Sequence, residues 1–145
     1  MVDCEWAILC DSIFRDERKK LCLIGIFSQI NTSSVPTVHA RAAVAIKLVG
    51  DANEGFQSHV EIVRPSGEQL TSFQFAGSTG PNGVVEVVIN FDNLQLPDWG
   101  IYSCNIQVGN QPPKPVTFAV LKVKSTPPPE QQFPQPPPLP ENPQP

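Results

Sequence analysis

Histidines and cysteines are the residues that could carry catalysis or bind a metal in this chain, and their spacing supports neither role. His39 and His59 each lie on or beside an expected strand, with no acidic or cysteine neighbour at the spacing of metal ligands. Cys10 and Asp11 would supply a nucleophile and a carboxylate, but adjacent residues of a strand point to opposite faces. The chain has no phosphate-binding loop, no G-x-S-x-G and no G-x-G-x-x-G motif. We therefore expect a protein that is not an enzyme, without catalytic residues, metal ligands or cofactors.

Three other side chains are candidates for binding a protein partner. Trp99 is the one large aromatic residue that the strand pattern does not assign to the core, and an exposed Trp at a loop tip is typical of binding hot spots. The structural alternative is that Trp99 covers one end of the fold. Phe133 and Leu139 lie in a proline-rich segment in which the string PPLP, residues 137–140, resembles a ligand of WW modules. Because this segment lacks the Lys or Arg that SH3 ligands add, its alternative is a stiff, solvated extension.

A strand with two distinct faces, residues 101–108, is the element around which these candidates must be arranged. Its apolar residues occupy every second position and alternate with polar ones: Tyr102, Cys104, Ile106 and Val108. This period of two predicts one buried face and one solvated face. A Pro, an Asp and a Gly in residues 96–100 predict a sharp reversal just before it. We expect the Tyr102 hydroxyl to bond back to this turn, which is the tyrosine corner of sandwich proteins.

Seven further strands are expected, separated by residues that break regular structure. They comprise residues 5–10, 21–27, 38–49, 59–64, 70–75, 85–91 and 116–123. In the third of these, at 38–49, Val44, Ile46 and Leu48 are expected to point inward. We expect no helix, because no window shows helical periodicity. An antiparallel sandwich with short connections accommodates such a pattern.

The connections carry their own predictions. Asp11 is expected to end the first strand, and residues 15–20 to form a charged hairpin tip. The strand at 21–27 is wholly apolar, which predicts cover on both faces or a central place in its sheet. Gly25 within it indicates a bulge or a close backbone approach. Residues 31–36 and 77–83 are expected to be loops, and the Pro-Ser-Gly at 65–67 a short hairpin turn.

Composition divides the chain into two parts. Residues 1–124 are expected to fold as one domain and residues 125–145 to form a disordered tail, because the last 19 residues hold 10 of the 17 prolines. The net charge is −4, and the only basic cluster lies in the mixed run 15–20, which argues against a nucleic-acid partner. The N-terminus is acidic where a signal peptide is basic, and no apolar run approaches the ~20 residues of a membrane helix. We expect a soluble, cytoplasmic protein with four reduced cysteines and no membrane partner.

Two resemblances follow from short motifs. Residues 98–104 have the D-x-G-x-Y-x-C form of the immunoglobulin F strand, although Cys22 lies about eighty residues earlier and no Trp occurs between Trp6 and Trp99. We interpret this match as a shared way of turning a strand corner. A closer resemblance rests on Cys10-Asp11 after an apolar strand, Lys20-Leu21 leading to Gly25-Ile26-Phe27, Pro36, Pro65-Ser66-Gly67 and the segment from Pro97 to Tyr102. These motifs resemble a family of short bacterial proteins classed as a domain of unknown function, which implies a bacterial, cytoplasmic, sandwich-like protein without an assigned activity.

The sequence thus predicts an all-β, antiparallel sandwich of immunoglobulin-like or Greek-key type, with about eight strands. We expect a non-catalytic protein-binding or assembly module, whose partner is another protein or a copy of itself. The alternative is a small-molecule or carbohydrate-binding sandwich that uses the loops 77–83 and 96–100. An exposed apolar or aromatic sheet face would favour assembly, and a concave loop pocket containing Trp99 would favour ligand binding. Convergent titratable groups would favour catalysis.

Overall fold

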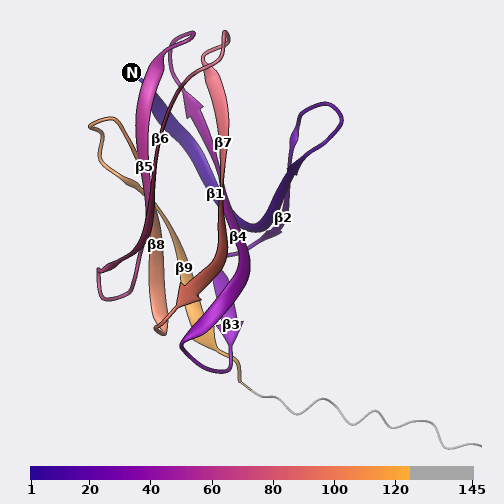
Figure 1. Cartoon of the computed structure of the whole chain (residues 1–145), viewed down its shortest axis with the longest axis vertical. Helices are drawn as coiled ribbons and strands as arrows, with labels where there is room; N and C mark the ends of the chain where they lie inside the picture. The colour runs from indigo at the N-terminus through magenta and orange to yellow at the C-terminus, as the bar shows by residue number, and fades with distance from the viewer. Residues whose placement is uncertain (125–145) are drawn as a thin grey trace, which may run out of the picture.

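The computed structural model describes residues 1–124, and these residues form an all-β sandwich of two sheets (Figure 1). Nine strands are present in this part of the chain, one more than expected: β1 (Asp3–Arg15), β2 (Leu21–Ile26), β3 (Gln29–Thr32), β4 (Thr37–Val49), β5 (Gly55–Val63), β6 (Gln69–Ser78), β7 (Val84–Leu96), β8 (Gly100–Val108) and β9 (Lys114–Lys122). One sheet has the order β2-β1-β4-β7 and the other β3-β9-β8-β5-β6. All neighbours are antiparallel except β3 and β9. The all-β sandwich is therefore confirmed.

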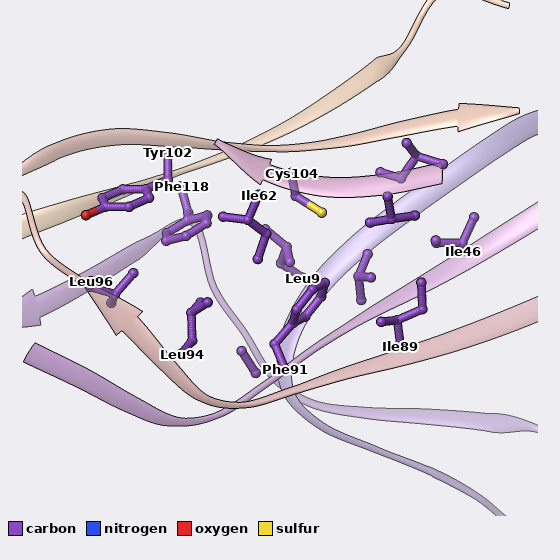
Figure 2. Close-up of a cluster of buried hydrophobic side chains, with 14 of the residues drawn as sticks. Leu9, Ile46, Ile62, Ile89, Phe91, Leu94, Leu96, Tyr102, Cys104 and Phe118 are labelled. Atoms are coloured by element: carbon purple, nitrogen blue, oxygen red, sulfur yellow. The ribbon is translucent and has the colours of Figure 1, made fainter. Parts of the chain in front are cut away.

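The hydrophobic core lies between the two sheets and follows the predicted alternation. Val44, Ile46 and Leu48 of β4 are fully buried, and the inward face of β8 is buried along its whole length. Figure 2 shows side chains of both sheets meeting in one layer, with Ile46 and Ile89 on one side and Cys104 and Ile62 on the other. Burying a side chain of this size stabilises the fold by about 1.5–3 kcal/mol.

The turn between β7 and β8 is the tyrosine corner that the sequence predicts. The Asp98 N–H donates to the Tyr102 hydroxyl, and that hydroxyl donates to the Asp98 carbonyl, each over 2.9 Å. The Tyr102 ring is fully buried and stacks on Phe118, with centroids 5.2 Å apart. The Asp98 carboxylate in turn accepts a hydrogen bond from Arg64 Nε over 2.8 Å. Residues 97–102 are thus fixed by both backbone and side-chain contacts.

The N-terminal third differs from the sequence predictions in three ways. β1 does not end at Asp11 but continues to Arg15. Part of the predicted loop 31–36 is strand, because β3 pairs in parallel with β9. The apolar strand β2 is neither central nor covered on both faces: it is the edge strand of its sheet. Each error concerns which distant strand a segment pairs with, and local periodicity does not encode that choice.

Smaller differences occur elsewhere. β6 continues to Ser78, so the predicted loop 77–83 is shorter than expected. The turn at 65–67 is confirmed: Gly67 has φ +88°, and its N–H donates to the Arg64 carbonyl over 2.9 Å. Within residues 1–124 the structure contains no helix that is long and apolar enough to cross a membrane.

Candidate interaction surface

The β1–β2 hairpin, residues 10–26, has a tip at residues 15–20 whose turn geometry follows from its sequence. The Asp16 N–H donates to the Lys20 carbonyl and the Lys19 N–H to the Asp16 carbonyl, each over 2.9 Å. Lys19 has φ +67° and is the left-handed residue of a type I turn with a bulge. Asp16 Oδ1 also accepts hydrogen bonds from the backbone N–H groups of Arg18 and Lys20. This solvent-exposed tip confirms the predicted role of residues 15–20.

At its base, the hairpin bends where Gly25 lies opposite Asp11. Gly25 has φ +70°, and a Cβ at this position would lie 2.4 Å from Asp11 Oδ2. Asp11 Oδ1 lies 3.0 Å from His39 Nε2 of β4, so this carboxylate joins the bend to the neighbouring strand. The His39 ring also packs edge-on against Phe27. The close approach expected at Gly25 is confirmed, whereas the Asp11–His39 contact was missed because 28 residues separate the two in the sequence.

Beyond the bend, the hairpin curves back beside the sandwich (Figure 1). Arg15 Nη1 donates to Glu86 Oε2 of β7 over 3.3 Å. Glu86 lies on the outer face of its sheet, because it alternates with Val85 and Val87, which pack against the core. This contact brings the tip of the hairpin to the outer face of β7, which the sequence did not predict.

Large apolar side chains on this hairpin are exposed to solvent. Phe14, Ile24 and Ile26 are 50%, 55% and 65% exposed. Phe14 pairs with Cys22, and Ile24 is two residues further along β2. The side chains of Phe14, Cys22 and Ile24 therefore share one face of the hairpin. From Leu21 to Phe27 the sequence contains no charged residue and no proline. This is the exposed apolar sheet element that favours assembly.

The outer edge of β2 also presents unpaired backbone groups. Antiparallel residue pairs alternate between hydrogen-bonded and non-hydrogen-bonded. Because Asp16 and Lys20 form the hydrogen-bonded pair that closes the hairpin, Cys22 is bonded to β1 as well. The N–H and C=O groups of Leu21 and Leu23 therefore point away from β1. A second strand could pair with them.

Trp99 lies in the turn between β7 and β8 and is 38% exposed. One open groove, of about 480 Å³, lies over β5, β6 and β8; polar residues such as Gln57, His59 and Gln74 line it, and Trp99 does not. The loops 77–83 and 96–100 precede and follow β7, a strand of 13 residues. Such a strand is about 40 Å long, so the two loops cannot form one pocket. The geometry thus gives the ligand-binding alternative no combined loop site.

Titratable groups form no cluster that could hold a metal ion in the described part of the chain. No group of three or more His, Cys, Asp or Glu side chains there could hold a metal ion. Burial raises the pKa of the Cys104 thiol to about 12, and it also raises the pKa values of Cys4 and Cys10. Thiols with raised pKa values are poor nucleophiles at neutral pH. All four cysteines are free, and Cys22 and Cys104 belong to different sheets.

Two of the predicted binding residues cannot be placed. Phe133 and Leu139 lie outside the described residues, as does the whole predicted tail at 125–145. The hairpin was missed as a surface because an uncharged apolar strand is usually buried. The signal that could have revealed it is the charged tip at 15–20, which predicts that β2 pairs with β1 and leaves its other edge undetermined.

A comparison with known protein families identifies the family of this chain. A model of a family of unknown function, DUF6941, matches residues 5–121. The chain belongs to this family. DUF6941 carries no assigned activity, and its match confirms the resemblance to an uncharacterised domain that the short motifs indicated. No curated protein matches the chain.

Two solved structures illustrate how far the similarity of this DUF6941 chain extends. One is the alkylpurine DNA glycosylase AlkC of Pseudomonas fluorescens bound to DNA containing an abasic site analog, at 14% identity and a TM-score of 0.45, covering 65% of this chain and 28% of that one. The other is the cupredoxin domain of amoB from Nitrosocaldus yellowstonii, at 14% identity and a TM-score of 0.30, covering 66% of this chain and 65% of that one. The chain spans less than two thirds of either protein's length, and likeness at this level supports no functional conclusion.

Proposed function

We propose that this chain is a non-catalytic protein-binding module whose docking element is the β1–β2 hairpin. The observation that carries the proposal is the edge strand β2, which is uncharged and apolar and exposes Ile24 and Ile26. Soluble proteins usually protect such edges with lysines, prolines or bulges, since an open edge pairs with other chains. β2 has one such interruption, the positive φ of Gly25, which leaves residues 21–24 open.

Docking on this edge is expected to follow strand addition. The unpaired backbone groups of Leu21 and Leu23 supply hydrogen bonds, and the exposed side chains of Phe14 and Ile24 supply apolar contact. The Asp11–His39 and Arg15–Glu86 contacts tie the base and the tip of the hairpin to the sandwich. The hairpin therefore loses less conformational entropy on binding than a free segment would.

The rest of the fold acts as the scaffold in this proposal. We infer that the sandwich is immunoglobulin-like, because its orders β1-β4-β7 and β9-β8-β5-β6 match the A-B-E and G-F-C-C′ strands of immunoglobulin sheets. The cytoplasmic, bacterial setting remains part of the proposal and rests on the family resemblance. The buried thiols support a non-catalytic role.

The experiment is affinity capture with two matched lysine variants. Ile24→Lys charges the hairpin, whereas Ile101→Lys charges a somewhat more exposed isoleucine (64%) on β8 of the other sheet. A protein captured from the native host by the wild type and by I101K should be absent with I24K. Equal capture by all three would show that the hairpin is not the docking element.

A further inference from the structure

We propose that the hairpin binds a second copy of this chain, with β2 against β2 in antiparallel orientation around a two-fold axis at Cys22. This inference rests on the proposed function and names its partner. An open strand edge is self-complementary under two-fold symmetry, because the same donors and acceptors face each other in reverse order. The pair would join two four-stranded sheets into one continuous sheet.

The unpaired backbone groups select one register. Only Leu21 and Leu23 point their N–H and C=O groups outward in the open part of β2. In each copy, both residues form backbone hydrogen bonds to the other copy only if Leu21 of one copy lies opposite Leu23 of the other. This register places Cys22 opposite Cys22 of the second copy, in a non-hydrogen-bonded pair. It also places Lys20 opposite Ile24 of the second copy.

The charges of the hairpin favour the antiparallel orientation. The tip, residues 15–20, has four basic and two acidic residues and therefore a net charge of +2. Parallel pairing would place the two tips side by side, whereas antiparallel pairing sends them to opposite ends. Charge thus opposes the parallel arrangement, whereas the antiparallel one keeps the two tips apart.

Apolar contact accompanies the backbone pairing. Phe14, Cys22 and Ile24 share one face of the hairpin. In the pair, the two sets become one continuous apolar strip across the two-fold axis. The contact involves one short strand per copy, which is at the small end of protein interfaces. We therefore expect a dimer whose population depends on protein concentration.

Cys22 reports this register directly. Non-hydrogen-bonded pairs have Cα atoms about 4.5 Å apart, which is within the range that a disulfide spans. Diamide should therefore link two copies through Cys22: each thiol loses one proton and one electron, the S–S bond forms, and diamide takes up both protons and both electrons. Cys10 and Cys104 are fully buried and do not compete.

The test combines sedimentation velocity of the full-length chain over a concentration series with diamide cross-linking. The wild type and I101K should dimerise alike. I24K places a lysine opposite Lys20 twice per dimer and should raise the dissociation constant about tenfold, whereas I24E should lower it or leave it unchanged. Diamide should give a disulfide dimer with the wild type and not with Cys22→Ala.

Each contrary result has a distinct meaning. A wild-type chain that stays monomeric and gives no diamide dimer overturns the second copy as partner, and the proposed function survives if I24K still loses a captured protein. If I24K loses none either, both proposals fail. A dimer that I24K leaves unchanged, or a diamide dimer that persists in C22A, overturns the Cys22 register. Equal weakening by I24K and I24E overturns the charge pairing with Lys20.

Discussion

The tyrosine corner and the β1–β2 hairpin are built from similar apolar strands, yet one is buried and the other exposed. In β8, Tyr102 and Cys104 are fully buried because a second sheet covers them. In β2, Ile24 and Ile26 are more than half exposed because no strand flanks the outer edge in the described residues. Apolar side chains therefore indicate that burial of a strand is favourable. Whether other strands of the same chain bury it depends on how distant strands pair.

Truncating one isoleucine in each region should give the largest difference. Ile46→Ala leaves a cavity in the core between the sheets, and we expect the free energy of unfolding to fall by about 2–5 kcal/mol. Ile24→Ala removes a side chain that is already half exposed, and the loss should stay below about 1 kcal/mol. Urea unfolding at a concentration where the chain is monomeric measures both. Similar losses for the two variants would show that the hairpin packs as tightly as the core.

The hydroxyl of Tyr102 tests the corner itself. Tyr102→Phe removes both hydrogen bonds to Asp98 and leaves the ring stacked on Phe118. We expect the free energy of unfolding to fall by about 0.5–3 kcal/mol, since the Asp98 groups lose a buried partner. Thermal and urea unfolding provide the measurement, and Cys22→Ala in the hairpin serves as the control. An unchanged Y102F protein would contradict a stabilising corner.

Alkaline pH should separate the two regions through Cys104. Its folded-state pKa of about 12 exceeds that of a thiol in the unfolded chain, about 8.5–9. The stabilisation is thus fully present below about pH 8.5 and is lost as the pH rises towards 12. Between pH 8 and 10, the free energy of unfolding of the wild type should fall by about 1.5 kcal/mol more than that of Cys104→Ala. A Cys22→Ala variant serves as the control for removing a thiol outside the core. The same pH dependence of the free energy of unfolding in the wild type and in Cys104→Ala would show that Cys104 is not a buried thiol.

The contact between Arg15 and Glu86 should give the smallest effect on stability. Both side chains are partly exposed, and such ion pairs contribute about 0.2–1 kcal/mol. Arg15→Gln should therefore change the free energy of unfolding by no more than about 0.5 kcal/mol, while amide hydrogen exchange in β2 becomes faster because the tip is no longer held to β7. Unchanged exchange in β2 would show that other contacts fix the hairpin.

Within single strands, the sequence was a reliable guide. The alternation of β8, the inward face of β4 and the turn at 65–67 were all predicted correctly, because each depends on residues that are close in the sequence. The tyrosine corner belongs to the same class, since Asp98 and Tyr102 are only four residues apart. Its support by Arg64 could not be predicted, because that contact spans 34 residues.

The candidate surface shows the limit of such reasoning. The sequence favoured Trp99, whereas the structure draws attention to Phe14, for which no role was predicted, and to Ile24, which the wholly apolar run 21–27 placed under cover. β3 was missed for a related reason: its four residues form a strand only because β9, almost ninety residues later, offers a free edge. Short segments acquire their structure from partners that local pattern does not reveal.

By itself, the sequence determined the all-β class, the buried face of β8 and the corner at Tyr102, because side-chain period and turn chemistry act over a few residues. The tertiary structure alone decided that β2 is an edge strand, that the hairpin folds back beside β7, and that the loops on either side of β7 lie far apart. These outcomes depend on which strands pair and on how the sheets stack, and the same apolar run satisfies either a central or an edge position until its neighbours are fixed.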